Sequence, residues 1–130
     1  MPRFSNSSLK KLNECHPLLQ SLFHEVIKKY DCKVICGYRT EEKQTEAFDN
    51  GFSKTKFPNS KHNLVPSHGI DVIPFPIDWT DHKRFYHFAG YVLGIANMHN
   101  VNIRWGGDWD IDLDFNDQTF YDLAHFEIVT

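Results

Sequence analysis

Three side chains that can bind a metal ion, and one carboxylate that can accept a proton, lie in two short segments of the sequence. His62 and Asp71 belong to Ser-Lys-His-Asn-Leu-Val-Pro-Ser-His-Gly-Ile-Asp, and His125 follows Asp122 in Asp-Leu-Ala-His-Phe-Glu near the C-terminus. A hydrolytic zinc site needs about three ligands of these types, an open coordination position and a nearby base. His62, Asp71 and His125 can supply the three ligands, and Asp122 can supply the base.

Neighbouring residues leave two parts of this site open. His68 lies within the first segment and can compete as a ligand. Asp122 can instead stand exposed at the entry of a strand or bond to an imidazole, and Glu127 is then the nearest substitute base. Alternate residues of a strand share a face, so Glu127 is expected beside His125, where it can orient the imidazole. Surface or helix-packing roles are expected for the other histidines, which are His16, His24, His82, His87 and His99.

Four motifs, in the same order along the chain, resemble those of a known group of peptidases. They are Gly37-Tyr-Arg-Thr followed by Gln44, Ser60-Lys-His through Pro66-Ser67 to Asp71-Val-Ile-Pro, Trp105-Gly-Gly-Asp-Trp, and the terminal Asp122-Leu-Ala-His-Phe-Glu. The chain resembles the zinc peptidases that include D-alanyl-D-alanine dipeptidases and carboxypeptidases, and the L-alanyl-D-glutamate endopeptidases that serve as phage endolysins.

The resemblance implies both the metal ligands and the catalytic group. It gives zinc ligands at His62, Asp71 and His125, and a catalytic carboxylate at Asp122, where many members of the family have Glu. Asp122 is then expected to take a proton from water and pass it to the leaving amine. Two more residues separate His62 from Asp71 than in the usual family pattern, and Gly69 stands where Ala is usual. This longer spacing is similar to that of phage-type members.

Other motif residues are expected to bind the substrate. Arg39 can stabilise an oxyanion or hold a substrate carboxylate, because its planar guanidinium pairs with oxygen anions. Its structural alternative is an ion pair with Glu41 or Glu42. Substrate contacts are also expected from Tyr38, Gln44, Ser60 and Trp105. Ser60 can instead orient the loop of His62, and Trp105 and Trp109 can instead fill the core.

Hydrophobic periodicity predicts the elements that must hold these residues. Helices are expected over residues 17–30 and 80–99, with a shorter helix capped by Ser7 or Ser8 and another that starts at Thr40. Strands are expected at 33–36, 69–74, 102–105 and 125–129. This mixed order favours an α+β domain with helices packed on a small antiparallel sheet. The resemblance implies the same fold, which is hedgehog-like or D-Ala-D-Ala-peptidase-like.

Length, charge and cysteine count restrict the class of protein. The 130 residues, 41% of them hydrophobic, suit one compact domain over residues 1–130. A net charge of -3 lacks the excess of Lys and Arg that a polyphosphate backbone requires, so no nucleic-acid partner is expected. The three cysteines are an odd number and are expected to be reduced and mostly buried. The aspartates of residues 108–117 lack the EF-hand pattern and are expected to form a solvated loop.

Together these features predict a zinc peptidase that cleaves the L-alanyl-D-glutamate bond of the peptidoglycan stem during phage lysis. The sequence shows no signal peptide and no membrane span, so we expect the protein to stay in the host cytoplasm until it is released to the wall. It is also expected to be a monomer. One alternative is a D-alanyl-D-alanine carboxypeptidase or dipeptidase, because pocket shape selects the cleaved bond. The other is a non-catalytic module that zinc stabilises.

Overall fold

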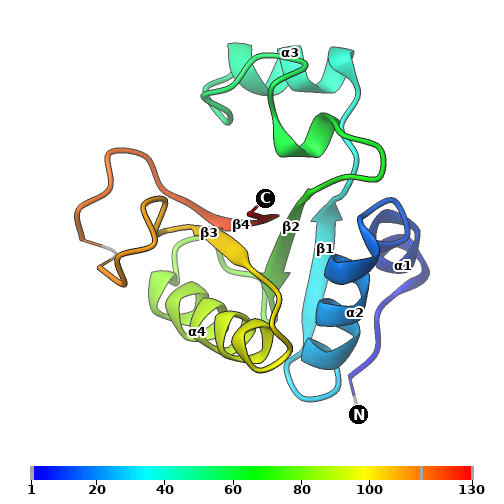
Figure 1. Cartoon of the computed structure of the whole chain (residues 1–130), viewed down its shortest axis with the longest axis vertical. Helices are drawn as coiled ribbons and strands as arrows, with labels where there is room; N and C mark the ends of the chain where they lie inside the picture. The colour runs from blue at the N-terminus through cyan, green and yellow to red at the C-terminus, as the bar shows by residue number, and fades with distance from the viewer. Residues whose placement is uncertain (1, 115, 130) are drawn as a thin grey trace.

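A four-stranded antiparallel sheet carries four α-helices in the computed structural model, which describes residues 2–114 and 116–129. The helices are α1 (Asn6–Leu12), α2 (Pro17–Val26), α3 (Glu41–Asp49), the short 3-10 helix η1 (Lys61–Asn63) and α4 (His82–Met98). The strands are β1 (Cys32–Cys36), β2 (Gly69–Pro74), β3 (Ile103–Gly106) and β4 (Asp122–Ile128). They are ordered β1-β2-β4-β3, which confirms the predicted α+β class (Figure 1).

The helix α3 starts at the predicted Thr40, which caps it, and α4 starts within its predicted range after the cap Asp81, whereas α1 starts earlier than expected. Ser5, rather than Ser7 or Ser8, caps α1 by accepting a hydrogen bond from the Ser8 N–H at 3.1 Å. The side chain of Ser8 is instead buried against β1, where its hydroxyl accepts a hydrogen bond from the Val34 N–H at 3.1 Å. The hydroxyl expected to cap a helix therefore connects that helix to the sheet.

The helix α2 begins at Pro17, as predicted, but it ends at Val26 rather than at residue 30. The N–H groups of Lys28 and Lys29 bond to carbonyls three residues back instead of four, so the last turn tightens and the α-helix stops. Tyr30 still packs in the predicted direction, with its ring 4.9 Å from that of Phe88. The hydrophobic periodicity thus predicted correctly that Tyr30 faces the core, although the α-helix ends at Val26.

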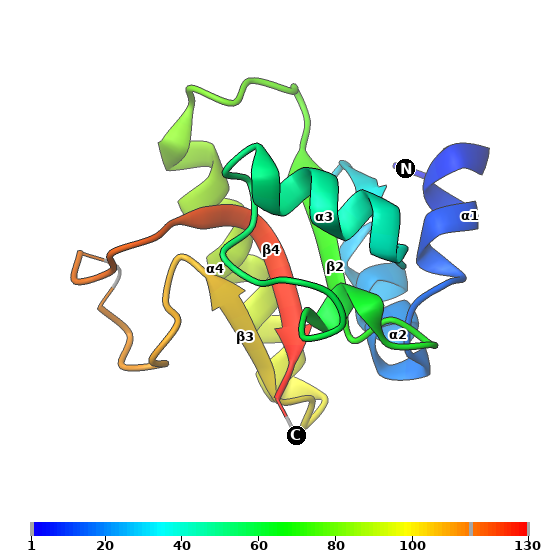
Figure 2. The same cartoon turned by 90° about the horizontal axis from the view of Figure 1, so that it is seen from above.

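The hydrophobic core lies between one face of the sheet and the helices α2 and α4. Phe126 of β4 has no exposed surface, and its ring lies 5.7 Å from that of Phe23 in α2 and 6.1 Å from that of Phe88 in α4. Ile70 and Val72 of β2 belong to the same fully buried cluster. The two views show α2 and α4 on one side of the strands and α3 on the other (Figures 1 and 2). The face beneath α3 is therefore available for a site.

The three cysteines are free thiols, as predicted, and Cys15 and Cys32 are buried. Burial raises the pKa of both buried thiols to about 12, which keeps them protonated. Among the described residues, no helix is both long and apolar enough to cross a membrane.

The acidic segment that follows β3 is only partly solvated. Its exposed members, as predicted, are Asp110, Asp112, Asp114 and Asp117. Asp108 differs, because only 7% of its surface is exposed and its carboxylate accepts hydrogen bonds from the N–H groups of Asp112 and Leu113 at 3.3 and 2.9 Å. This carboxylate braces the turn from within, so the acidic segment is solvated except at Asp108.

Candidate active site

Asp71 and His125 lie opposite each other on the two central strands. The register pairs Asp71 of β2 with His125 of β4, and directly opposed residues of antiparallel strands lie about 4.5–5.5 Å apart. Their neighbours Ile70 and Phe126 are buried in the core beneath the helices. Because side chains alternate along a strand, Asp71 and His125 face the side covered by α3. Strand pairing thus joins two residues that are 54 positions apart in the sequence.

His62 reaches the same point from η1. The hydroxyl of Ser60 caps η1 by accepting a hydrogen bond from the His62 N–H at 3.2 Å, and the His62 carbonyl accepts one from the Arg39 N–H at 2.8 Å. Nε2 of His62 lies 3.2 Å from Nδ1 of His125 and 3.2 Å from Oδ1 of Asp71. Nδ1 of His125 and Oδ1 of Asp71 are 3.1 Å apart. The three residues expected to bind a metal therefore converge.

This triangle of donor atoms fits a tetrahedral zinc ion. Ligand atoms about 2.0–2.1 Å from such an ion lie about 3.3 Å from one another. The outer ring nitrogens also have partners: Nδ1 of His62 lies 2.7 Å from the carbonyl oxygen of Gly37, and Nε2 of His125 lies 2.8 Å from Oε1 of Glu127. A neutral imidazole that donates its proton to these acceptors directs the lone pair of its inner nitrogen towards Asp71. Three acceptors that face one another at this distance suit a cation between them.

The carboxylate of Asp71 makes the cluster favour positive charge. Burial lowers the pKa of both imidazoles, but the charge and hydrogen bonds of Asp71 outweigh it and raise the pKa of His62 to about 10. With the further help of Glu127, the pKa of His125 rises to about 8. Burial opposes ionisation of Asp71, yet the two imidazoles hold the pKa of this carboxyl well below its ordinary value. A divalent cation would neutralise the same carboxylate.

Asp122 joins the cluster from the start of β4. A shift in the register of β3 and β4 places Gly106 opposite Asp122, and irregularities of this kind turn a side chain away from regular alternation. A Cβ at Gly106 would collide with the carbonyl of Asp122, so this approach requires glycine. A carboxylate oxygen of Asp122 lies within 4.8 Å of donor atoms of Asp71 and His125. Burial, and next the charge of Asp71, raise the pKa of Asp122 to about 6.

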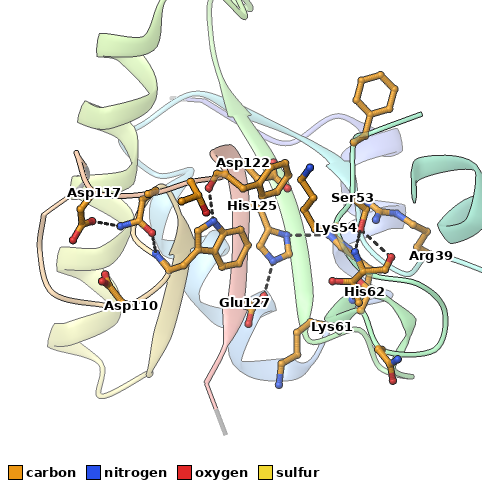
Figure 3. A pocket seen from close by; sticks show the side chains of 18 residues that line it. Arg39, Ser53, Lys54, Lys61, His62, Asp110, Asp117, Asp122, His125 and Glu127 are labelled. Atoms are coloured by element: carbon orange, nitrogen blue, oxygen red, sulfur yellow. Dashed lines mark hydrogen bonds and ion pairs between the residues drawn. The ribbon is translucent and has the colours of Figure 1, made fainter. Parts of the chain in front are cut away.

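A cavity of about 610 Å³ opens beside this cluster. Figure 3 shows His125 and His62 between Arg39 on one side and Asp110 and Asp117 on the other. The ring of Trp109, which also lines the cavity, lies 5.6 Å from that of His125. Cavities of about 300–1,000 Å³ commonly bind small ligands, so this space can accept a peptide segment next to the ligand triangle.

Arg39 connects the cluster to α3. Its Nη2 donates to Oδ2 of Asp71 at 3.3 Å, so its ion pair is with a proposed ligand rather than with a neighbouring glutamate. Its Nη1 donates to Oε1 of Gln44 at 3.0 Å. Gln44 has no exposed surface, and its amide nitrogen donates to the Ser53 hydroxyl at 2.9 Å and the Thr55 carbonyl at 2.6 Å. The expectation that Gln44 contacts substrate is therefore corrected, because its side chain is enclosed by the protein.

The other residues expected to contact substrate are divided between the cavity and the core. Ser60 lines the cavity while it caps η1, so it holds the loop of His62 beside the space that a substrate would enter. Trp105 is only 5% exposed, its indole N–H donates to a backbone carbonyl of β4, and its ring lies 6.1 Å from that of Tyr86. It therefore fills the core, and Trp109 lines the cavity instead. Tyr38 lines a smaller cavity beside α3, which Arg39 and Phe52 also border.

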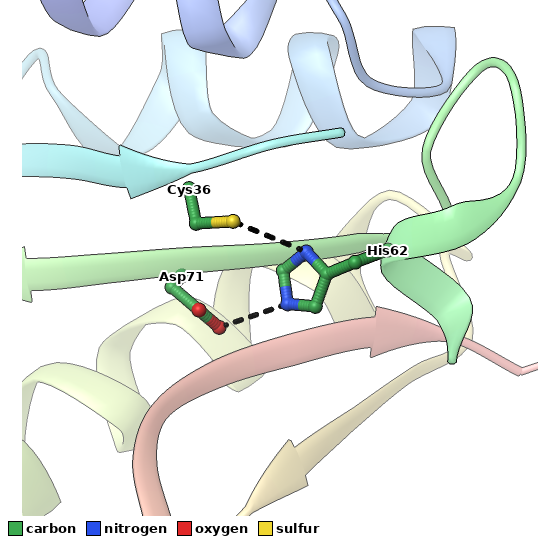
Figure 4. Close-up of side chains that lie close together, drawn as sticks. All are labelled: Cys36, His62 and Asp71. Atoms are coloured by element: carbon green, nitrogen blue, oxygen red, sulfur yellow. Dashed lines mark hydrogen bonds and ion pairs between the residues drawn. The ribbon is translucent and has the colours of Figure 1, made fainter. Parts of the chain in front are cut away.

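Cys36 borders the triangle, with its Sγ within 4.8 Å of ligand atoms of His62 and Asp71, whereas His68 makes a different contact. Sγ of Cys36 is 3.8 Å from Nδ1 of His62, whereas Asp71 faces Nε2 on the opposite side of the ring (Figure 4). The sequence did not indicate Cys36, although it directly precedes the Gly37 motif. The ring of His68 packs against that of His16, with centroids 5.1 Å apart. The structure therefore places His68, which the sequence left open as a ligand, in a different contact.

Two imidazoles and a carboxylate that share one point, with a second carboxyl group and a cavity beside them, form an arrangement used by metal-dependent hydrolases. Comparison with protein families agrees with this class. Residues 1–129 match the family described as phage L-alanyl-D-glutamate peptidase, and the chain belongs to this family of peptidases.

A solved structure also shows the predicted fold. The crystal structure of the Serratia marcescens L-Ala D-Glu endopeptidase ChiX resembles this chain with a TM-score of 0.78 and 23% sequence identity. The similarity covers 98% of this chain and 91% of that chain. No curated protein matches the chain by sequence. The fold predicted from the four motifs is thereby confirmed.

Proposed function

We propose that this peptidase depends on zinc and hydrolyses the L-alanyl-D-glutamate bond in the peptide stem of bacterial peptidoglycan. The convergence of His62, Asp71 and His125 on one point at the edge of a cavity carries the proposal. Imidazole and carboxylate ligands in a tetrahedral arrangement suit zinc. In an infected bacterium, the peptidase would remain in the cytoplasm until its release to the wall, where its activity contributes to lysis.

The metal ligands and Asp122 divide the chemical work. His62, Asp71 and His125 hold the ion, and a bound zinc ion supplies a positive charge that polarises the scissile carbonyl and acidifies water. Asp122 accepts the proton of the attacking water and delivers it to the leaving amine. Its position beside two of the ligands, at the edge of the cavity, supports this role.

Arg39 and Glu127 support the same reaction from opposite sides of the cluster. Arg39, held by Asp71 and Gln44, offers its remaining N–H groups to the developing oxyanion or to a substrate carboxylate. Glu127 accepts the outer N–H of His125 and so fixes the orientation of that ligand. Ser60 keeps η1, and with it His62, beside the cavity.

Digestion of purified sacculi tests the cleaved bond. We expect the zinc-loaded protein to release fragments with new L-alanine C-termini and new glutamate N-termini, identified by mass spectrometry, and we expect a chelator to stop their release. Released D-alanine would instead assign a carboxypeptidase or dipeptidase. A zinc-loaded protein that binds sacculi and produces no new termini would be a binding module, contrary to the proposal.

Substitution of Gln44 is expected to lower activity through Arg39. Gln44→Met keeps the approximate size of the buried side chain but removes its bond to Nη1 of Arg39. Loss of an orienting partner of this kind costs about 10–100-fold, so we expect kcat to fall within that range while the zinc content is unchanged. Arg39→Lys, which cannot form the planar pair, should lower kcat/KM by about 100-fold.

A double-mutant cycle separates positioning from general destabilisation. If Gln44 acts by orienting the guanidinium, Gln44→Met should have little further effect on kcat in the Arg39→Lys background. Additive losses in the double variant would show that Gln44 acts independently of Arg39. Gln20→Met is the matched control, because the amide of Gln20 bonds to the Cys15 carbonyl beside α2, away from the cavity.

A further inference from the structure

A second cavity meets the catalytic one at Arg39 and Asp122. It has a volume of about 460 Å³ and shares four lining residues with the larger cavity, the other two being Phe52 and Phe120. Asp71 also lines it. The end of α3, the start of β4 and the segment between β2 and α4 surround this part of the molecule (Figure 2). The proposed catalytic centre thus opens into two connected spaces, which from here are called the polar arm and the aromatic arm.

Exposed aromatic side chains line the aromatic arm. Phe52 is 75% exposed, Trp79 is 55% exposed and Tyr121 is 42% exposed. The Trp79 ring stacks on that of Phe85, with centroids 5.6 Å apart and an angle of 26° between the planes, so Phe85 supports one face of the indole. Large aromatic surfaces that gather in solvent beside a catalytic centre indicate a binding surface.

The two arms differ in charge. The polar arm is bordered by five further charged side chains, those of Lys54, Lys61, Asp110, Asp117 and Glu127, beside Trp109 and the Phe52 and Phe120 that it shares with the aromatic arm. The charged residues that line the aromatic arm, among those described, are Arg39, Asp71 and Asp122, and all three belong to the proposed catalytic centre. Beyond these three, its lining is aromatic, aliphatic or glycine. One side of the substrate should therefore be charged, and the other should present an uncharged, partly apolar surface.

The substrate assigned under the proposed function, on which this inference rests, has the same asymmetry. On the amine side of the cleaved bond, the glutamate carries a free carboxyl group and is followed by a residue with a second amine. On the acyl side, the alanine is joined through a lactyl group to the amino sugar N-acetylmuramic acid. An alanyl and a lactyl unit span about 7 Å at about 3.3–3.6 Å per residue, which carries the sugar beyond the catalytic centre and into the adjoining arm.

We propose that the aromatic arm binds the N-acetylated sugar of the glycan strand, with the Trp79 ring as its main platform. One face of a pyranose ring presents C–H groups, which pack well on the electron-rich face of an indole. The N-acetyl methyl group is also apolar and can contact Phe52 or Tyr121, while the hydroxyl groups remain in water. The peptidase thereby recognises stems that are still attached to glycan, which is the form present in an intact wall.

Two substrates, one with the lactyl-linked sugar and one without it, test this assignment. The first is the disaccharide peptide released from sacculi by a muramidase, and the second is the same peptide with an N-acetyl group in place of the lactyl sugar. The wild-type protein should cleave the first with a kcat/KM about tenfold higher, mainly through a lower KM. Trp79→Leu, which keeps an apolar contact with Phe85, should remove this preference while it changes cleavage of the second substrate less than twofold.

Equal cleavage of the two substrates by the wild type would overturn the proposal. A Trp79→Leu variant that loses activity equally on both would also overturn it, because the arm would then bind the peptide. Met98→Ala is the control for an exposed apolar side chain, since Met98 is 79% exposed at the end of α4 and lines neither arm. Equal melting temperatures of wild type and variants verify folding.

A binding measurement distinguishes this inference from the proposed reaction. The free disaccharide of N-acetylglucosamine and N-acetylmuramic acid should bind to the zinc-loaded wild type, and Trp79→Leu should weaken its binding at least fivefold in a titration followed by NMR. Sugar binding without cleavage of either peptide would contradict the proposed function and support the sugar site. Cleavage of both peptides without sugar binding would support the proposed function and overturn the sugar site.

Discussion

His62→Ala and His125→Ala should each abolish stoichiometric zinc binding and lower the rate of wall hydrolysis by more than about 1,000-fold, because catalysis with a bound metal supplies several kcal/mol of transition-state stabilisation. Each substitution removes one corner of a triangle whose sides are 3.1 to 3.2 Å, and two ligands cannot hold the ion in the remaining geometry. Elemental analysis of the gently purified wild type should give about one zinc per chain. Removal with a chelator should stop hydrolysis, and added zinc should restore it.

His68→Ala is the matched control for these variants. His68 belongs to the same sequence segment as His62 and is also an imidazole, but its ring packs against that of His16 outside the triangle. We expect His68→Ala to keep both the zinc and the lytic activity. Loss of zinc in this variant, or full activity of the wild type in excess chelator, would contradict the proposed ligand set.

The sequence indicated the three proposed ligands, but it did not indicate how they meet. His62, Asp71 and His125 could be named because only a few residue types bind zinc and because they lie in motifs with a known order. Their convergence depends on the pairing of β2 with β4, which places Asp71 opposite His125, and on the cap that Ser60 provides for η1. Such pairing between distant segments follows from tertiary packing and has no local signal in the sequence.

The expected substrate contacts show the limit of motif reasoning. Gln44 and Trp105 both belong to motifs, yet Gln44 is enclosed between Arg39 and the segment at Ser53, and Trp105 is buried against α4. A motif records that a position tolerates few residue types, whether the reason is contact with substrate or internal packing. Burial decides between these reasons, and for a polar side chain such as that of Gln44 it cannot be read from hydrophobic periodicity.

Asp122 shows a related limit, because regular alternation would direct a residue three positions before His125 to the opposite face of β4. The register shift at Gly106 removes that difficulty and brings Asp122 beside Asp71 and His125. Alternation does place Glu127 on the face of His125, where, as expected, its carboxylate bonds to the outer nitrogen of the imidazole and can orient it.

Asp122→Asn should lower kcat by about 100- to 10,000-fold, the usual contribution of a positioned general acid or base, while the protein keeps its zinc. The amide has nearly the same size and polarity as the carboxyl group, but it cannot accept a proton from water and pass it to the leaving amine. Single-turnover hydrolysis of a stem peptide, measured together with the zinc content, separates this effect from loss of the metal. The separation is possible because Asp122 lies outside the ligand triangle.

Asp114→Asn controls for the loss of one negative charge, since Asp114 is exposed in the same acidic region of the chain and lines neither arm. It should retain wild-type activity. If Asp122→Asn binds zinc and hydrolyses the wall at the wild-type rate, another group must move the proton. Glu127→Gln then becomes the decisive variant, because Glu127 is the other carboxylate on β4 that lines the cavity, and a fall in kcat with zinc retained would transfer the role of base to it.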